Sequence, residues 1–183
     1  MSFPVPSNRP ARISLVMPRI EKIKKRHLLK RKQQKTEIEK IEGALGTRVN
    51  IDDKTQLEIG LLDDGTEVLI YQNEILFFAK DNRYFPSLHA LLNGMVTVPK
   101  VIVDMGAVRF VVNGADIMRP GVTGVEDEVR AGSVVAVVDE NHAKPLAVGL
   151  ATMDADEIRN ATKGKVVLSV HHVNDHLWDF TKS

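Results

Sequence analysis

The chain of 183 residues contains no cysteine. It therefore forms no disulfide and offers no thiolate to a metal, which suits the reducing cytoplasm and argues against secretion. The sequence also lacks any run of about 18 apolar residues, the length that a membrane-spanning helix needs. Pro4, Pro6 and Pro10 interrupt the N-terminus, which has no apolar core like that of a signal peptide. We expect a cytoplasmic protein without a membrane segment.

Motifs of catalytic sites are missing as well. The sequence has no Gly-x-x-x-x-Gly-Lys-Ser/Thr loop, no Gly-x-Gly-x-x-Gly fingerprint and no Gly-x-Ser-x-Gly turn. Asp63-Asp64-Gly65 is far more typical of a turn than of a paired-carboxylate site. His171, His172 and His176 form a cluster, but adjacent strand residues point to opposite faces, so we favour surface or nucleic-acid contacts over a metal site. The sequence predicts no enzyme activity, no cofactor and no metal.

The net charge of +1 conceals an uneven distribution of charge, in which the basic residues are concentrated at the N-terminal end. The first 35 residues hold eleven Lys and Arg against Glu21 alone, a balance of +10, and the remainder has a balance of −9. Such a basic block is typical of a polyanion partner, although an acidic protein, the acidic half of the chain or plain solvation are alternatives. Aromatic residues make up only 5% and are not interleaved with the cations. This pattern favours structured RNA, bound through its phosphates, over stacked single strands.

The stretch 104–122, DMGAVRFVVNGADIMRPGV, is the most informative one. Asp104 is suited to cap a short helix, and Asn113-Gly114 is suited to end it in the left-handed conformation. Ile117-Met118 then begins a strand that Pro120-Gly121 bends or ends. We interpret the stretch as a helix, a glycine loop and a strand.

The turn at Gly114-Ala115 carries a functional prediction. Because these residues have almost no side chain, another chain is able to come close to their backbone. We expect their amides to be free to donate hydrogen bonds to phosphate or base-edge oxygens. A tight turn in a small β-barrel explains the same residues without any ligand.

This stretch resembles the glycine-loop signature of the PUA domain, a small RNA-binding module named after pseudouridine synthases and archaeosine transglycosylases. The resemblance covers about Val98 to Phe180 and implies a pseudo-barrel. The resemblance implies that a strand near 98–103 opens this barrel and that the last strand returns to lie near the first helix. The later segments occur in the family's order: VVAVVDE (134–140), PLAVGLATM (145–153), the helix start DADEIRNA (154–161), and KGKVVLSVHHVNDHLW (163–178), interpreted as a further pair of strands.

Two upstream segments, KRHLLKRKQQKTEIEKI (25–41) and YFPSLHALL (84–92), resemble the domain that precedes PUA in archaeal PUA proteins and their eukaryotic relatives. Those relatives are the malignant T-cell amplified sequence protein and ligatin, which act with the small ribosomal subunit. The implied fold class is α+β, a small α/β N-terminal (pre-PUA) domain followed by a C-terminal PUA β-pseudo-barrel. We divide the chain into an irregular basic arm (1–19), a pre-PUA domain (20–97) and a PUA domain (98–183). The cysteine-containing features of some relatives are absent here, which leaves a shared protein partner open.

Periodicity and turn residues predict the N-terminal elements. The spacing of Ile38, Ile41 and Leu45 predicts a helix from about Lys32 that Gly46 ends. Alternation predicts a hairpin over 56–71 and a third strand over 74–78, and we place Pro86 in the first turn of a short helix that runs through Leu92. Residues 107–112 favour a strand by propensity, and only the resemblance makes them a helix.

The resemblance places RNA against the first PUA helix, the glycine loop and the last strand. Arg109 and Arg119 are the expected phosphate ligands. For Asp116 and Met118, a purely structural role is the alternative to RNA contact. The expected RNA is tRNA or small-subunit rRNA, with the small ribosomal subunit or a translation factor as partner. An accessory subunit for RNA modification and a protein-interaction module in translation initiation or recycling stay open. The RNA-binding residues nominated by position or by charge are Gly106, Ala107, Arg109, Gly114, Ala115, Asp116, Met118, Arg119, Pro120, Gly121, Lys24, Lys25, Arg26, Lys30, Arg31 and Lys32.

Overall fold

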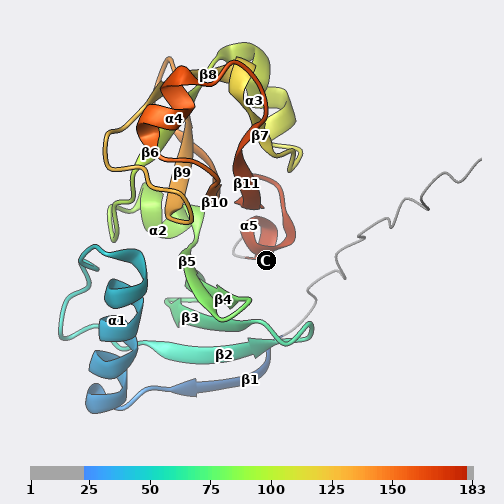
Figure 1. Cartoon of the computed structure of the whole chain (residues 1–183). Helices are drawn as coiled ribbons and strands as arrows, with labels where there is room; N and C mark the ends of the chain where they lie inside the picture. Colours follow the sequence, from blue (N-terminus) through green and yellow to red (C-terminus); the bar gives the residue numbers. More distant parts are fainter. Residues whose placement is uncertain (1–22, 181–183) are drawn as a thin grey trace, which may run out of the picture.

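The computed structural model describes residues 23–180, which form two β-sheets with helices around them (Figure 1). The basic arm predicted for residues 1–19 lies outside the described residues. The elements follow one another as β1 (Ile23–Leu28), α1 (Arg31–Leu45), β2 (Glu58–Leu62), β3 (Glu67–Tyr71), β4 (Glu74–Lys80), β5 (Arg83–Pro86), α2 (Leu88–Leu92), β6 (Lys100–Val103), α3 (Met105–Val111), β7 (Ile117–Met118), η1 (Arg119–Gly121), β8 (Val122–Val125), β9 (Val134–Asp139), β10 (Pro145–Ala151), α4 (Ala155–Asn160), β11 (Lys165–His172) and α5 (His176–Phe180).

The N-terminal sheet is an antiparallel meander with the strand order β1-β2-β3-β4-β5. Two-residue turns join β3 to β4 at Gln72-Asn73 and β4 to β5 at Asp81-Asn82, and all four residues have φ between 47° and 70°. Positive φ at both central positions matches the twist of a hairpin, and Asn and Asp tolerate it better than most residues. The predicted hairpin and third strand are confirmed as β2, β3 and β4.

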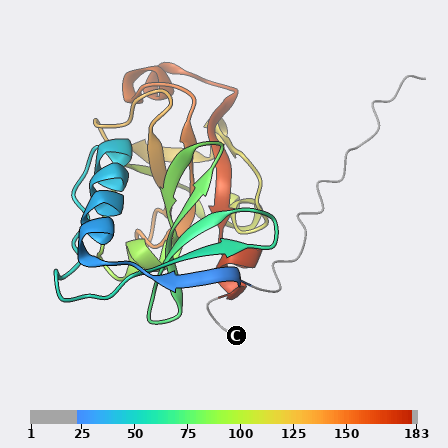
Figure 2. The ribbon, with the colours of Figure 1, turned by 90° about the horizontal axis from the view of Figure 1, so that it is seen from below.

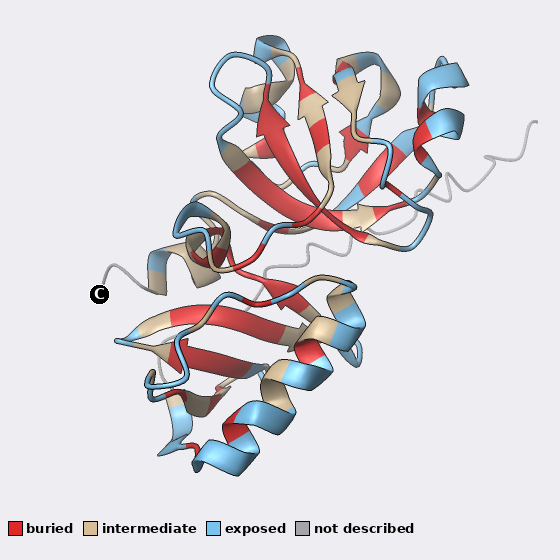
Figure 3. Cartoon of the chain, turned by 90° about the vertical axis from the view of Figure 1, so that its left-hand side faces the viewer, coloured by how far each residue is buried: buried red, intermediate tan, exposed pale blue. Residues whose placement is uncertain are grey.

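Helix α1 covers one face of this sheet, with its outer face exposed (Figures 2 and 3). Ile41 is fully buried in a cluster with Leu57 and Phe77. The helix ends at Gly46, as predicted, where φ is 68° and the amide donates to the Glu42 carbonyl at 2.8 Å. Because the other face of the sheet is covered by the C-terminal half, β4 is buried along four successive residues.

The C-terminal sheet has the strand order β7-β11-β10-β9-β6-β8. Strand β6 pairs in parallel with β9, with Val101 opposite Val137, and the other pairs are antiparallel. The end strands β7 and β8 are linked by only the three residues of η1, so the sheet curls into a nearly closed barrel around Val135, Ile158 and Val167. The predicted α+β fold class, with a small N-terminal α/β domain followed by a C-terminal β-pseudo-barrel, is confirmed.

The two sheets share one hydrophobic cluster. It joins Phe78 and Leu88 from the first half to Val148 from the second, with Trp178 of α5 packed against it. Trp178 also stacks on His89 of α2, with ring centroids 4.7 Å apart. Helix α5 therefore helps to hold the barrel against α2.

Two local predictions need correction. Pro86 is the last residue of β5 rather than part of a helix, which an edge strand with one neighbour tolerates because the missing N–H is not needed. Helix α2 begins after Ser87, whose Oγ accepts from the Ala90 amide at 3.1 Å. The second predicted strand of 163–178 is wrong, because the chain turns at Asn174 (φ 67°) and forms α5. Strands β1 and β5 were not predicted at all.

Candidate nucleic-acid interface

Helix α3 is positioned by its cap. The Asp104 carboxylate accepts from the Ala107 amide at 2.8 Å, as the sequence predicts for a helix N-cap. The Asp104 amide in turn donates to the Gly121 carbonyl at 2.9 Å, so the start of α3 is fixed against the end of η1. A Cβ on Gly121 would meet the Ala107 Cβ at 3.1 Å, which shows how closely the two elements pack. One face thus combines α3, β7 and β11 (Figure 1), and η1 belongs to it through its contacts with the beginning of α3.

The glycine turn has the predicted backbone conformation but not the predicted free amides. Gly114 has φ 83°, the left-handed conformation expected from the sequence. Its amide, however, donates to the Val111 carbonyl at 3.0 Å, and the Ala115 amide donates to the Phe110 carbonyl at 3.0 Å. The prediction of free amides is therefore wrong, because the helix C-terminus uses both donors to satisfy its own carbonyls.

The close approach at Gly114 is also internal. A Cβ on this residue would lie 2.6 Å from Nε2 of His172 on β11. The missing side chain thus makes room for a ring of the same chain. Gly114 shapes the face by letting α3 and β11 come together.

Two nominated polar side chains hold the fold together. Asp116 accepts from the Ser169 amide at 2.9 Å and pairs with the Lys165 ammonium at 3.0 Å, which joins β7 to β11. The Arg119 guanidinium donates to the carbonyls of Ile158 at 2.5 Å and Val122 at 3.1 Å. Arg119 therefore ties the end of α4 to η1 and has little left to offer a phosphate.

Large apolar side chains on this face are exposed. Met105 and Phe110 of α3 are 45% and 55% exposed, Met118 of β7 46% and Leu168 of β11 42%. The Arg109 guanidinium lies over the Phe110 ring, 4.6 Å from its centroid. Sequence reasoning missed Met105, Phe110 and Leu168, because an apolar residue in a short helix or strand is normally core.

The nominated residues of this face differ in exposure. Exposed are Gly106, Arg109, Ala115, Met118 and Pro120, and partly buried are Ala107, Gly114, Asp116, Arg119 and Gly121.

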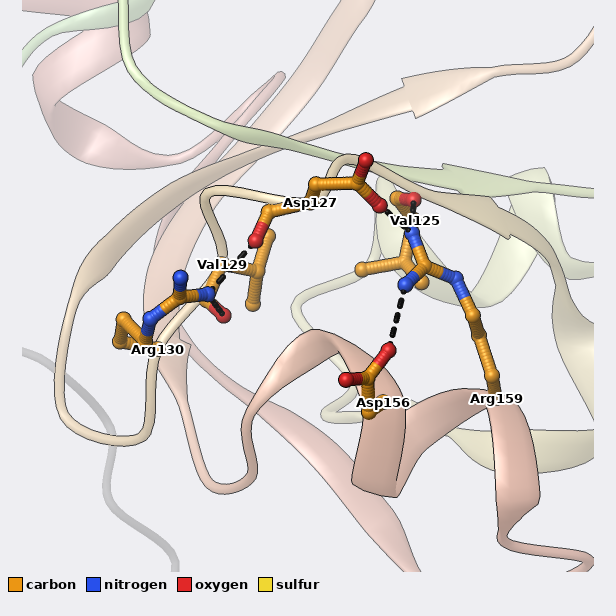
Figure 4. A network of polar contacts seen from close by, with 6 residues as sticks. All are labelled: Val125, Asp127, Val129, Arg130, Asp156 and Arg159. Atoms are coloured by element: carbon orange, nitrogen blue, oxygen red, sulfur yellow. Dashed lines mark hydrogen bonds and ion pairs between the residues drawn. The ribbon is translucent and has the colours of Figure 1, made fainter.

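Two arginines elsewhere on the barrel are engaged in a polar network (Figure 4). Arg159 of α4 pairs with Asp127 and with Asp156, the latter at 2.8 Å, and donates to the Val125 carbonyl at 2.9 Å. Arg130 donates to the carbonyls of Asp127 and Val129. These arginines fix the loop between β8 and β9 and leave Arg109 as the accessible arginine of the α3 face.

The basic residues of β1 and of the beginning of α1 divide into two kinds. Arg26 forms a two-pronged pair with Glu58, at 2.5 and 2.8 Å, and also donates to Asn73. This hydrogen bonding raises the pKa of Arg26 and lowers that of Glu58. Lys24 donates to the Asp63 carbonyl at 3.0 Å. In contrast, Lys25, Lys30, Arg31 and Lys32 are exposed and form no ion pair with another residue of the range 23–180.

The histidine cluster is structural in part. His171 is fully buried, contrary to the expected surface position, and its Nδ1 lies 2.7 Å from the Asp175 carboxylate. Its Nε2 accepts from the Leu88 amide at 3.1 Å, so this nitrogen is not available to activate a nucleophile. Within residues 23–180, no group of three or more His, Cys, Asp and Glu side chains is arranged to hold a metal ion. The same part of the chain contains no helix long and apolar enough to cross a membrane.

Known proteins resemble both halves of the chain. The PUA domain model matches residues 99–173, and the model described as a domain of unknown function (DUF1947) matches residues 25–93. An uncharacterised protein of Methanocaldococcus jannaschii is 37% identical over 86% of this chain and 98% of its own. Translation machinery-associated protein 20 of Saccharomyces cerevisiae is 34% identical over 70% of this chain and 74% of its own. Malignant T-cell-amplified sequence 2 of Homo sapiens is 35% identical, with coverages of 68% and 71%. A PUA-domain protein of Aeropyrum pernix, solved as a tartrate complex, superposes with a TM-score of 0.76 at 28% identity, over 87% of this chain and 91% of its own.

Proposed function

The chain belongs to the family of PUA-domain proteins that includes translation machinery-associated protein 20, and we propose that it is a non-catalytic protein that binds structured RNA, such as tRNA or small-subunit rRNA. The proposal places it in the cytoplasm, in association with the translation machinery. It rests on the match to a PUA domain and on the similarity to the yeast protein, whose name associates it with that machinery.

The α3 face is the surface that we assign to RNA. Its single most telling feature is Phe110, a large aromatic side chain that is 55% exposed beside the cation of Arg109. An exposed ring is suited to stack on an unpaired base of a structured RNA, and the guanidinium beside it is suited to a phosphate or to the base plane. Met118 and Leu168 on the neighbouring strands extend the apolar surface.

This assignment divides the nominated residues by role. We propose that Gly106, Ala107, Arg109, Met118 and Pro120 contact RNA, together with Phe110. Gly114, Ala115, Asp116, Arg119 and Gly121 shape the face through the internal contacts described above. The division of the chain into two domains near residues 94–98 stays a prediction.

Fluorescence anisotropy with bulk tRNA tests the proposal. Phe110→Ala is expected to weaken binding roughly fivefold or more, because stacking of one base on an aromatic side chain contributes about 1–3 kcal/mol. Arg109→Gln is expected to weaken it as well. Leu28→Ala is the matched control, since Leu28 is also 55% exposed but lies on β1. Equal affinities for Phe110→Ala, Arg109→Gln and Leu28→Ala would exclude the α3 face as the RNA site.

A second candidate function is a protein-interaction module of the translation machinery. The exposed Met105, Met118 and Leu168 favour it, because Met is enriched at protein interfaces. Sedimentation of a cell extract distinguishes the two. Co-migration with ribosomal subunits that survives mild nuclease and the Phe110→Ala change favours protein contacts, and loss after either treatment favours RNA.

A further inference from the structure

A second basic surface lies at the beginning of α1. Lys30, Arg31, Lys32 and Lys35 stand within six residues of one another, and all four are exposed. The chain returns to this place in the turn before β2, where Lys54 is also exposed. We call these five side chains the α1 basic surface. It lies at the opposite end of the molecule from α3 (Figure 1).

A buried glutamine holds the two segments together. Gln34 is only 6% exposed, and its amide group donates to the Thr55 carbonyl at 2.7 Å and accepts from the Leu57 amide at 3.1 Å. The turn itself is closed by Asp52, whose carboxylate accepts from the Lys54 amide at 2.8 Å. Lys54 is therefore fixed beside the first turn of α1, although it stands 19 or more positions away in the sequence.

The two segments enclose a shallow hollow of about 300 Å³. Lys30, Arg31 and Lys54 line it, and Asp53 is the one acidic residue among the lining side chains. The excess of cations makes the hollow suited to an anion.

The basic side chains at the beginning of α1 are placed unfavourably with respect to the dipole of the helix. The N-terminal end of a helix carries partial positive charge, which acidic side chains stabilise and basic ones oppose. The first turn of α1 contains no acidic residue, and Lys35 has only a loose, exposed pair with Glu39 at 3.9 Å. Helix α4 of the same chain shows the favourable arrangement, with Asp156 and Glu157 in its first turn and Arg159 in its last. The α1 basic surface thus lowers the stability of its helix, and a bound polyanion would relieve that repulsion.

We propose that the α1 basic surface is a second phosphate-binding surface, which contacts the backbone of the same structured RNA that the α3 face recognises. This inference rests on the proposed function. The partner is a folded RNA rather than a short single strand, because a contact at the far end of the molecule needs an RNA that extends past the α3 face. The surface adds affinity without reading sequence, since its five groups are cations that recognise phosphate charge. Lys24 and Arg26 are not part of it, because both are engaged within the sheet.

The test measures binding of bulk tRNA over a series of salt concentrations. Arg31→Gln/Lys54→Gln is expected to weaken binding at least threefold and to reduce the slope of log affinity against log salt by roughly 0.9 for each phosphate that the variant no longer neutralises. Arg48→Gln/Lys144→Gln is the matched control, since it removes two exposed cations at other places. A single-stranded oligonucleotide of about six nucleotides, too short to extend past the α3 face, should bind both double variants equally.

The outcomes separate this inference from the proposed function. Unchanged affinity and slope in Arg31→Gln/Lys54→Gln, with weaker binding in Phe110→Ala, would overturn the second surface and leave the α3 face intact. Unchanged binding in both variants would overturn both. Circular dichroism and a melting curve confirm that each variant is folded, which is expected because the substituted side chains are exposed.

Discussion

The Nε2 atom of His171 accepts a hydrogen bond from the Leu88 amide at 3.1 Å, and this bond crosses from the C-terminal barrel to helix α2. Because Nε2 accepts, the ring proton lies on Nδ1, where it is donated to Asp175 at 2.7 Å. The edge of the His171 ring also meets Phe78 of β4, with centroids 5.6 Å apart. One fully buried side chain therefore joins both sheets through polar and apolar contacts.

His171→Ala is expected to lower the free energy of unfolding by about 3 kcal/mol, because it leaves a cavity and deprives the Leu88 amide and Asp175 of their partner. Urea denaturation followed by circular dichroism measures the change. His142→Ala, at a histidine whose side chain is 81% exposed, is the control and should stay within about 0.5 kcal/mol of the wild type. A loss below about 1 kcal/mol in His171→Ala would contradict the role of the bond.

The acid side of the stability curve should depend on Asp175. Burial raises the pKa of its carboxyl, but the hydrogen bond from His171 and those from the Trp178 and His172 amides outweigh burial and hold the pKa below the ordinary value of 3.8. The folded state thus favours the carboxylate. Its contribution to stability is present above about pH 4 and is lost as the pH falls through the folded-state pKa.

Urea unfolding at pH 5, 4 and 3 is the measurement for this effect. The wild type is expected to lose more stability over this range than Asp175→Asn, which carries no titrating carboxyl there. Parallel losses in the two proteins would show that other carboxylates dominate the acid response.

The sequence predicts elements whose signals are local. Asp104 and Gly114 mark the two ends of the α3 segment, and each acts through backbone atoms only a few residues away. Strand β1 has no such signal, because five of its six residues are exposed and only its pairing with β2 makes it a strand. Its run of cations gives no period-2 pattern to detect.

The candidate site was harder to predict than the fold, because the sequence does not tell which arginines are free. Arg26 is bound by a residue 32 positions away and Arg119 by one 39 positions away. Lys54 joins the α1 basic surface only through the contacts of Gln34. The exposure of Phe110 likewise depends on how α3 packs on the barrel. The family motif therefore led us to nominate its neighbours but not Phe110 itself.

Arg119→Lys separates a structural from an RNA-binding role. Lysine keeps the charge but cannot reproduce the fork that reaches the Ile158 and Val122 carbonyls, so we expect a loss of about 1–2 kcal/mol in stability. The affinity of the folded variant for bulk tRNA should stay within twofold of the wild type. Weaker RNA binding with unchanged stability would show instead that Arg119 contacts phosphate, as expected from the sequence.

Gly114→Ala is expected to destabilise the protein for two separable reasons. An L residue at φ 83° costs about 1 kcal/mol relative to glycine. The new Cβ would in addition lie 2.6 Å from Nε2 of His172, a separation at which the ring must move. We therefore expect a loss of roughly 2 kcal/mol or more in the single variant.

A double-mutant cycle with His172→Ala isolates the second reason, because it removes the ring and leaves the backbone conformation unchanged. In that background Gly114→Ala should cost only about 1 kcal/mol, the backbone share. Urea denaturation of the four proteins gives the coupling energy between the two sites. If Gly114→Ala costs the same with and without the His172 ring, the φ requirement alone explains the glycine, and the packing of α3 against β11 does not depend on this contact.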